Sequence, residues 1–137
     1  MSNQEVIEKL WDQRDQINFI EDSEAKKNIE NVLSLLDQGK LRVCEKKDDI
    51  WHVNQWLKKA ILLSFRIQDM EMISGGPSVS HGNTSWWDKV PSKFQNWTSE
   101  NFQSAGFRAV PNCVVRRSAF IATVSYTHLT LPTKEGV

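Results

Sequence analysis

The chain has 137 residues, which suits one ordinary domain with a modest core and is too short for two. Hydrophobic residues make up 39% of the chain and charged residues 25%, with six Trp and six Phe, which is typical of a globular protein rather than a disordered or fibrous one. Because 17 basic residues balance 17 acidic ones, the positive excess of a phosphate-backbone binder is missing, and nucleic acid is not favoured as a partner.

Two helices are predicted in the first part of the chain. Ser2 and Glu5 have the form of a capping box, and apolar residues follow at helical spacing as far as Ile17. A second helix is predicted to be capped by Ser23 or Asp22 and to stop at Gly39, which tolerates the left-handed conformation past a helix end. Its apolar stripe is the strongest helical pattern in the sequence: Ala25, Ile29, Val32, Leu33 and Leu36.

A small hairpin and a third helix follow. Residues 41–46 and 50–53, separated by the charged residues 47–49, predict two short paired strands. Asn54 suits the N-cap of a helix that is apolar around most of its circumference, so we expect this helix to be central and buried. Its apolar residues are Trp56, Leu57, Ala60, Ile61, Leu62, Leu63, Phe65 and Ile67.

The second half of the chain begins with a predicted surface loop over residues 74–85, which are rich in Gly, Ser, Pro and Asn. Residues 75–78 lack the Lys and the spacing of a phosphate-binding loop. A short capped amphipathic segment at 98–105 then leads to extended residues at 107–111. The predicted fold class is therefore mainly α with a small β-hairpin, an α+β arrangement.

Cysteine and histidine positions indicate neither a metal site nor a catalytic triad. Cys44 and Cys113 form no CxxC pair and have no His at ligand spacing, so we expect them to be small apolar fillers. No Ser, Cys or acidic residue lies at a triad spacing from His52 or His81. We therefore predict no bound metal.

Membrane and export signals are also missing. The longest apolar run, residues 60–65, is far shorter than the ~20 residues that a membrane-spanning helix needs. The first residues have neither the basic start nor the apolar stretch of a signal peptide. We expect a cytoplasmic location and no membrane partner.

Five phrases, taken together, point to a family. In the second half they are WDKVPSKF at 87–94, GFRAVP at 106–111 and VRRSAFIA at 115–122, and upstream they are LRVCEK at 41–46 and NQWLKKAILLSFR at 54–66. In order and spacing this set resembles the bacterial tetrahydrodipicolinate N-succinyltransferases, at the junction where a helical N-terminal domain meets a left-handed β-helix. No single phrase identifies the family; the resemblance rests on the order and spacing of all five.

The resemblance covers residues 1–122 and implies a division of the chain. Residues 1–111 would form the helical N-terminal domain, and residues 112–122 the start of a hexapeptide-repeat β-helix domain that is otherwise missing. In the family, succinyl-CoA donates a succinyl group to tetrahydrodipicolinate on the diaminopimelate route to lysine, and the enzyme is a homotrimer. CoA and the catalytic carboxylates lie on the β-helical domains, so we expect no catalytic or cofactor-binding residue in this chain, and no activity from it alone.

Arg108 is the one site residue that the resemblance assigns. The Arg of the family's Gly-Phe-Arg-x-Val-Pro phrase contributes to binding the cyclic dicarboxylate substrate. A guanidinium suits that role because it is planar, always charged and offers paired donors to a carboxylate. The alternative is that Arg108 forms a structural ion pair at the domain junction.

Several other residues have a functional and a plain structural interpretation. Arg116 and Arg117 are interpreted as a solvated pair, and Trp86 and Trp87 as residues packed in the core against the junction. Two further functions stay open, a standalone helical protein-interaction module and a weak nucleic-acid binder. The residues concerned are Trp86, Trp87 and Trp97 for the first, and Lys58, Lys59, Arg116 and Arg117 for the second.

The resemblance stops at Ala122. Residues 124–133 read VSYTHLTLPT, which looks like a transposon-end sequencing adapter translated in one frame. We therefore predict that residues 123–137 are a non-native tail that does not belong to the fold.

Overall fold

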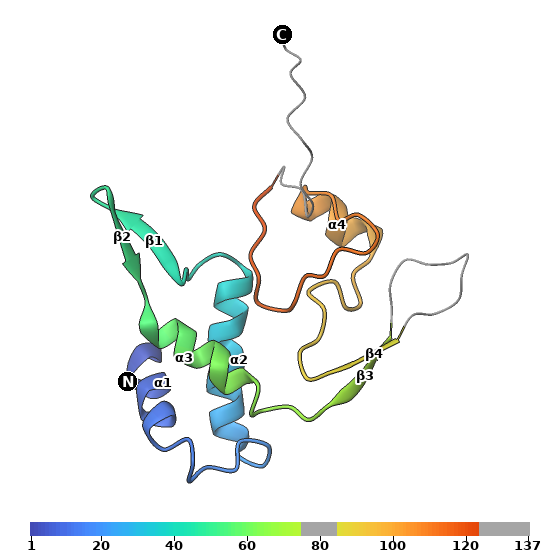
Figure 1. The fold of residues 1–137 in the computed structure, drawn as a ribbon. Coiled ribbons are helices and arrows are strands. Elements are labelled where there is room, and N and C mark those ends of the chain that lie inside the picture. Colours follow the sequence, from blue (N-terminus) through green and yellow to red (C-terminus); the bar gives the residue numbers. More distant parts are fainter. Residues whose placement is uncertain (75–84, 124–137) are drawn as a thin grey trace.

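Helices and two small sheets alternate along the chain in a computed structural model that describes residues 1–74 and 85–123 (Figure 1). The elements in chain order are α1 (Asn3–Asp12), α2 (Ser23–Asp37), β1 (Cys44–Lys47), β2 (Ile50–Val53), α3 (Gln55–Ser64), β3 (Glu71–Ser74), β4 (Ser85–Asp88) and α4 (Ser99–Ala105). β1 pairs with β2, and β3 with β4, both antiparallel. This confirms the predicted α+β class and adds a second sheet that the sequence did not indicate.

Helices α1, α2 and α3 pack around one apolar core (Figure 1). The predicted capping box starts α1, since the Glu5 carboxylate accepts from the Ser2 N–H at 2.7 Å and the Ser2 hydroxyl accepts from the Glu5 N–H at 3.2 Å. The helix ends at Asp12, earlier than the apolar spacing suggested, and Ile17 packs against the core from the turn that follows. The buried core residues are Ile7, Phe19, Ala25, Ile29, Val32, Leu33, Leu36, Leu57, Ala60, Leu63 and Ile67.

Helix α2 confirms its prediction at both ends. The Asp22 carboxylate accepts hydrogen bonds from the N–H groups of Glu24 and Ala25 at 3.1 and 2.9 Å, which satisfies free donors at the helix start. Gly39, just past the end, has a φ of 72°, a conformation that costs residues with a Cβ more than it costs glycine. All five residues of the predicted apolar stripe are buried.

The first sheet differs from its prediction in detail. β1 begins at Cys44 rather than at residue 41, and the cysteine is exposed, so its interpretation as a filler is wrong. Asn54 is the N-cap of α3 by position, but its side chain makes no capping bond. Its amide instead donates to the Arg42 carbonyl at 2.7 Å and to the Glu45 carboxylate at 3.1 Å, tying β1 to the start of α3.

Helix α3 is central, as predicted, but buried on one face only. It packs against both α1 and α2, with Leu57, Ala60 and Leu63 buried. Leu62, on the opposite face, is 52% exposed. The apolar residues of this helix therefore extend beyond what the core covers.

The second sheet places two tryptophans on the surface. Met72 lies opposite Trp87, and Ile73 opposite Trp86. Residues directly opposite each other share a face, so Met72 and Trp87, 69% and 67% exposed, form one apolar pair open to solvent. The expectation that Trp86 and Trp87 belong to the core is wrong, because the sheet holds them away from the helices. The predicted loop lies mostly at residues 75–84, outside the described residues.

Candidate functional site

Arg108 follows directly from the end of α4. The Thr98 N–H donates to the Asn101 side chain at 2.8 Å at the start of this helix, as the predicted cap requires. Gly106 ends it in the left-handed conformation, with a φ of 71°, and Phe107 and Arg108 come next. Arg108 is exposed.

Four aromatic rings pack together beneath this turn, and we call Phe94, Trp97, Phe102 and Phe107 the aromatic cluster. The Trp97 ring lies with its centroid 4.9 Å from that of Phe102 and 5.9 Å from that of Phe107. Phe94 lies 5.2 Å from both Trp97 and Phe102 and 5.9 Å from Phe107. Tilted and edge-on contacts at these distances are the favourable geometries for aromatic pairs. The cluster joins α4 to the chain before and after it.

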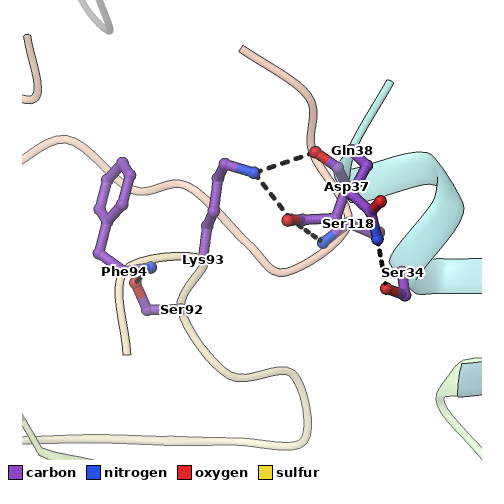
Figure 2. A network of polar contacts seen from close by, with 7 residues as sticks. All are labelled: Ser34, Asp37, Gln38, Ser92, Lys93, Phe94 and Ser118. Carbon is purple, nitrogen blue, oxygen red and sulfur yellow. Dashed lines mark hydrogen bonds and ion pairs between the residues drawn. The ribbon is translucent and has the colours of Figure 1, made fainter. Parts of the chain in front are cut away.

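A polar network joins the cluster to the end of α2 (Figure 2). The Lys93 ammonium lies 2.8 Å from the Asp37 carboxylate and 3.4 Å from the Asp37 carbonyl, and the lysine side chain is only 5% exposed. The same carboxylate oxygen accepts from the Ser118 N–H at 3.2 Å. A positive charge here also faces the negative end of the α2 dipole. Asp37 therefore holds two segments that lie far apart in the sequence.

Residues 112–122, which we call the junction segment, dock onto the rest of the molecule through charged side chains. Arg116 pairs with Asp88 at 2.6 Å, and Arg117 with Glu30 at 3.7 Å. The Arg116 side chain is 53% exposed, in agreement with its interpretation as solvated, whereas Arg117 is partly buried at 31% and neither ion pair was expected. Their backbone is also held, since the Arg117 N–H donates to the Pro91 carbonyl at 2.9 Å.

The end of the junction segment covers the turn after α2. The Phe120 ring lies 2.8 Å from the position that a Cβ on Gly39 would occupy. The Arg42 guanidinium also stacks on the Phe120 ring, with its Cζ atom 4.4 Å from the ring centroid. A residue with a side chain at position 39 would displace the ring, so the glycine makes this close approach possible.

The remaining residues singled out from the sequence do not gather into a site. His52 is exposed on β2, and His81 lies outside the described residues. Lys59 pairs with Glu8, whereas Lys58 is exposed. Within residues 1–74 and 85–123, no group of three or more His, Cys, Asp or Glu side chains could hold a metal ion. That part of the chain also has no helix with the length and apolar character to cross a bilayer.

Among the described residues, the carboxylates of Glu5 and Glu45 have a lowered pKa, and both hold local structure. The Glu5 pKa is lowered mainly by the hydrogen bond from the Ser2 backbone and then by the Ser2 side chain. The Glu45 pKa is lowered mainly by the hydrogen bond from the Asn54 side chain and then by Lys47. In each case a donor stabilises the ionised form. Glu5 therefore stabilises the start of α1, and Glu45 stabilises the first sheet.

Comparison with known proteins identifies the class of domain. Residues 2–67 match the family model described as Tetrahydrodipicolinate N-succinyltransferase N-terminal. This range holds all three helices of the core, the first sheet and the core residues from Ile7 to Ile67. The class is therefore the N-terminal domain of the N-succinyltransferase family.

Curated relatives agree with this class. Proteins named 2,3,4,5-tetrahydropyridine-2,6-dicarboxylate N-succinyltransferase are 59% identical over 122 residues in Brucella suis and 58% identical over 122 residues in Brucella ovis and Brucella abortus. Each alignment covers 88% of this chain and 42% of the relative. The chain belongs to the tetrahydrodipicolinate N-succinyltransferase family, and it spans about two fifths of the length of the curated relatives it matches.

Sequence reasoning missed the residues around Asp37. Lys93 and Ser118 lie 56 and 81 positions from Asp37 along the chain, so no local spacing brings them together. The only available signal was the lysine inside the family-like phrase at residues 87–94. Arg108 was singled out by resemblance, and its substrate role stays a prediction.

Proposed function

We propose that this chain is the N-terminal part of an enzyme that transfers a succinyl group from succinyl-CoA to tetrahydrodipicolinate, on the diaminopimelate route to lysine. The observation that supports this most is the 59% identity, over 122 residues, to a relative named for that transfer. The proposal includes the family's homotrimer and a cytoplasmic location, where succinyl-CoA is formed.

Within this proposal, Arg108 binds a carboxylate of the cyclic dicarboxylate substrate. Its support is the matching Gly-Phe-Arg-x-Val-Pro phrase together with its exposed position after α4. A guanidinium binds a carboxylate through two parallel N–H donors and keeps its charge at any relevant pH. Lysine would keep the charge but lose the paired geometry.

The proposed division of labour is that this chain contributes to substrate binding, while the acyl-transfer chemistry takes place on the β-helical domain of the full-length family members. Acyl transfer to nitrogen needs a CoA site, a group that manages the amine proton and donors for the tetrahedral oxyanion. The resemblance assigns these to the β-helical domains, beyond the two fifths of the relatives that this chain matches. We propose that residues 1–111 form the substrate-side domain, that residues 112–122 lead out of it, and that the 137-residue chain alone does not turn over substrate.

A chimera tests the proposed reaction. Residues 1–122 would replace the aligned 122 residues of the Brucella suis relative. Release of free CoA would be followed in the presence of succinyl-CoA and tetrahydrodipicolinate. We expect the chimera to turn over and Arg108→Lys to raise the KM for the dicarboxylate about tenfold or more, with little change in the KM for succinyl-CoA.

The matched control is Arg66→Lys, which alters another exposed arginine, paired with Asp15. It should behave like the parent chimera. A folded chimera without activity would contradict the proposed reaction, and an Arg108→Lys chimera with an unchanged KM would contradict the role of this residue. Turnover by the unfused chain would contradict the proposed division of labour.

The origin of residues 123–137 is a separate proposal, that they derive from an adapter sequence. Residues 124–137 lie outside the described residues, so the support is the sequence phrase alone. Re-sequencing the source DNA by a method that adds no transposon ends is the test. Recovery of codons for hexapeptide repeats after Ala122 is expected, and recovery of the same ending would contradict the proposal.

A second candidate function is a protein-interaction module, and the exposed face of the second sheet favours it. On that face Met72 and Trp87 expose 69% and 67% of their surface; Trp86 is on the opposite face at 47%, and Trp97 belongs to the aromatic cluster. Large exposed aromatic side chains are typical of contact surfaces. Size-exclusion chromatography of the chain and of Trp87→Ser distinguishes the outcomes. Self-association that the substitution abolishes would support the module, and a monomer in both cases would count against self-association through this face.

A further inference from the structure

Lys93 is the most deeply buried charged side chain in the described part of the molecule, at 5% exposure, and its burial needs an explanation. Removing an ammonium group from water costs several kcal/mol unless a partner compensates. Asp37 supplies that partner at 2.8 Å. A well-packed apolar residue would hold the same space without this cost, so the charge itself is the feature to account for.

Contacts lead from this charge to the turn that carries Arg108. The Lys93 ammonium lies 5.9 Å from the Trp97 ring centroid, within the range of a cation–π interaction. Trp97 in turn packs on Phe107 at 5.9 Å, and Phe94, the residue after Lys93, packs on Phe107 at the same distance. Phe107 directly precedes Arg108, so a displacement of the Phe107 ring would be passed to the Arg108 backbone.

Asp37, the partner of Lys93, also binds the junction segment. The Asp37 carboxylate accepts from Ser118 as well as pairing with Lys93 (Figure 2). One oxygen at the end of α2 therefore fixes both the aromatic cluster and the junction segment.

We propose that Lys93 is a positioning residue for Arg108, which acts through Trp97 and Phe107 to hold the guanidinium where it meets a dicarboxylate. The inference rests on the proposed function, because it presumes that Arg108 binds substrate. Binding geometry is sensitive to small displacements, and misplacement of a positioning group by about 1 Å can cost about a hundredfold. Loss of the Lys93 charge should therefore weaken dicarboxylate binding without unfolding the domain.

The experiment is a nuclear magnetic resonance titration of the 15N-labelled 137-residue chain with pyridine-2,6-dicarboxylate, a stable planar dicarboxylate. The side-chain Nε–H signal of Arg108 reports the contact directly. We expect Lys93→Met to raise the Kd about tenfold and to shift this signal in the free protein, and Lys93→Arg to restore both. The control Lys89→Met removes a partly buried lysine that donates to the Phe65 carbonyl at 3.4 Å, and it should leave the Kd unchanged.

The outcomes separate the inference from the function on which it rests. If the unmodified chain does not bind, or if Arg108→Lys binds equally well, the substrate role of Arg108 fails. If Arg108→Lys weakens binding while folded Lys93→Met binds like the parent, only the positioning role fails. Should Lys93→Met unfold, the double variant Asp37→Asn/Lys93→Met removes both charges and keeps an oxygen for the Ser118 N–H, and parent-like binding by it would also overturn the inference.

Discussion

The helical core, residues 1–67, and the outer region, residues 85–123, are held together by different forces (Figure 1). Every hydrophobic residue of the buried core lies in the first, from Ile7 to Ile67. The outer region has a buried lysine, an aromatic cluster of partly buried rings and an internal ion pair between Arg116 and β4, and it is joined to α2 by two further ion pairs. An apolar core is non-directional and tolerant, whereas ion pairs and hydrogen bonds depend on single groups.

This difference predicts two levels of stability in one small chain. The helical core coincides with the family-model match at residues 2–67 and has what a small domain needs to fold. The outer region has little apolar burial of its own, so its order depends on docking to α2. Local regions with few buried apolar contacts open at lower free energy than the core.

The largest effect is expected from breaking the helical core. Leu63→Ala removes a 1% exposed side chain and should lower the free energy of unfolding by about 2–5 kcal/mol, since it loses burial and leaves a cavity. Leu62→Ala, next to it but 52% exposed, should cost under about 1 kcal/mol. Urea titration followed by helical circular dichroism measures both. Equal losses would contradict the one-sided burial of α3.

Breaking the link between the regions should come next. Asp37→Ala leaves the Lys93 ammonium buried without its carboxylate partner, which should cost about 2–3 kcal/mol, less than for a fully buried pair because the Asp37 side chain is 33% exposed, and should open the outer region first. Hydrogen exchange at the Ser118 N–H should accelerate more than exchange in α1. The matched control is Asp15→Ala, which breaks the exposed pair with Arg66 and should cost under about 1 kcal/mol. Uniform acceleration throughout the chain would mean that the two regions open as one.

A smaller effect should follow at the turn after α2. Gly39→Ala should destabilise the protein by about 1–2 kcal/mol, because a φ of 72° is strained for alanine and the new Cβ would meet the Phe120 ring. Thermal unfolding of Gly39→Ala, Phe120→Ala and the double variant separates the two causes. If the ring contact dominates, the double variant will lose less than the sum of the single losses. Additive losses would leave backbone strain as the whole cause.

The smallest effect is expected from pH at the start of α1. The folded-state pKa of Glu5 lies below its ordinary 4.5, so its stabilisation is present above the unfolded pKa and is lost as pH falls through the lower folded value. Acidification from neutral pH to about pH 3 should therefore lower the protection of the Glu5 N–H, measured against the intrinsic exchange rate of an unstructured amide at the same pH, while α2 changes less. Glu5→Gln should show a weaker pH dependence at this helix end. An identical pH profile in the variant would remove the carboxylate as the cause.

The sequence was sufficient for the parts of the fold that local patterns determine. The Ser2 to Glu5 box, the Asp22 cap and the α2 stripe are all signals within one or two helical turns, and all are confirmed. The tryptophans of β4 show the limit, because large aromatics favour strands and cores alike. Their exposure follows from the pairing of β3 with β4, and no short sequence pattern near Trp86 and Trp87 predicts that pairing.

The candidate site was less accessible to sequence reasoning. Arg108 emerged only through a family phrase, and its substrate role stays a prediction. Arg116 and Arg117 looked solvated because their acidic partners, Asp88 and Glu30, stand 28 and 87 positions away. Ion pairs that join distant segments leave no periodic trace, since any of the 17 acidic residues could have been the partner.

The long separation between Asp37 and its partners also orders events at the ribosome. Chains emerge from the N-terminus, and folding can begin on the part already made. The residues of the helical core are available once Ile67 has emerged, but the Asp37 carboxylate meets Lys93 and Ser118 only after 56 and 81 further residues have followed it. In the nascent core the Asp37 carboxylate at the end of α2 therefore stays without these two partners until the later part of the chain has been translated.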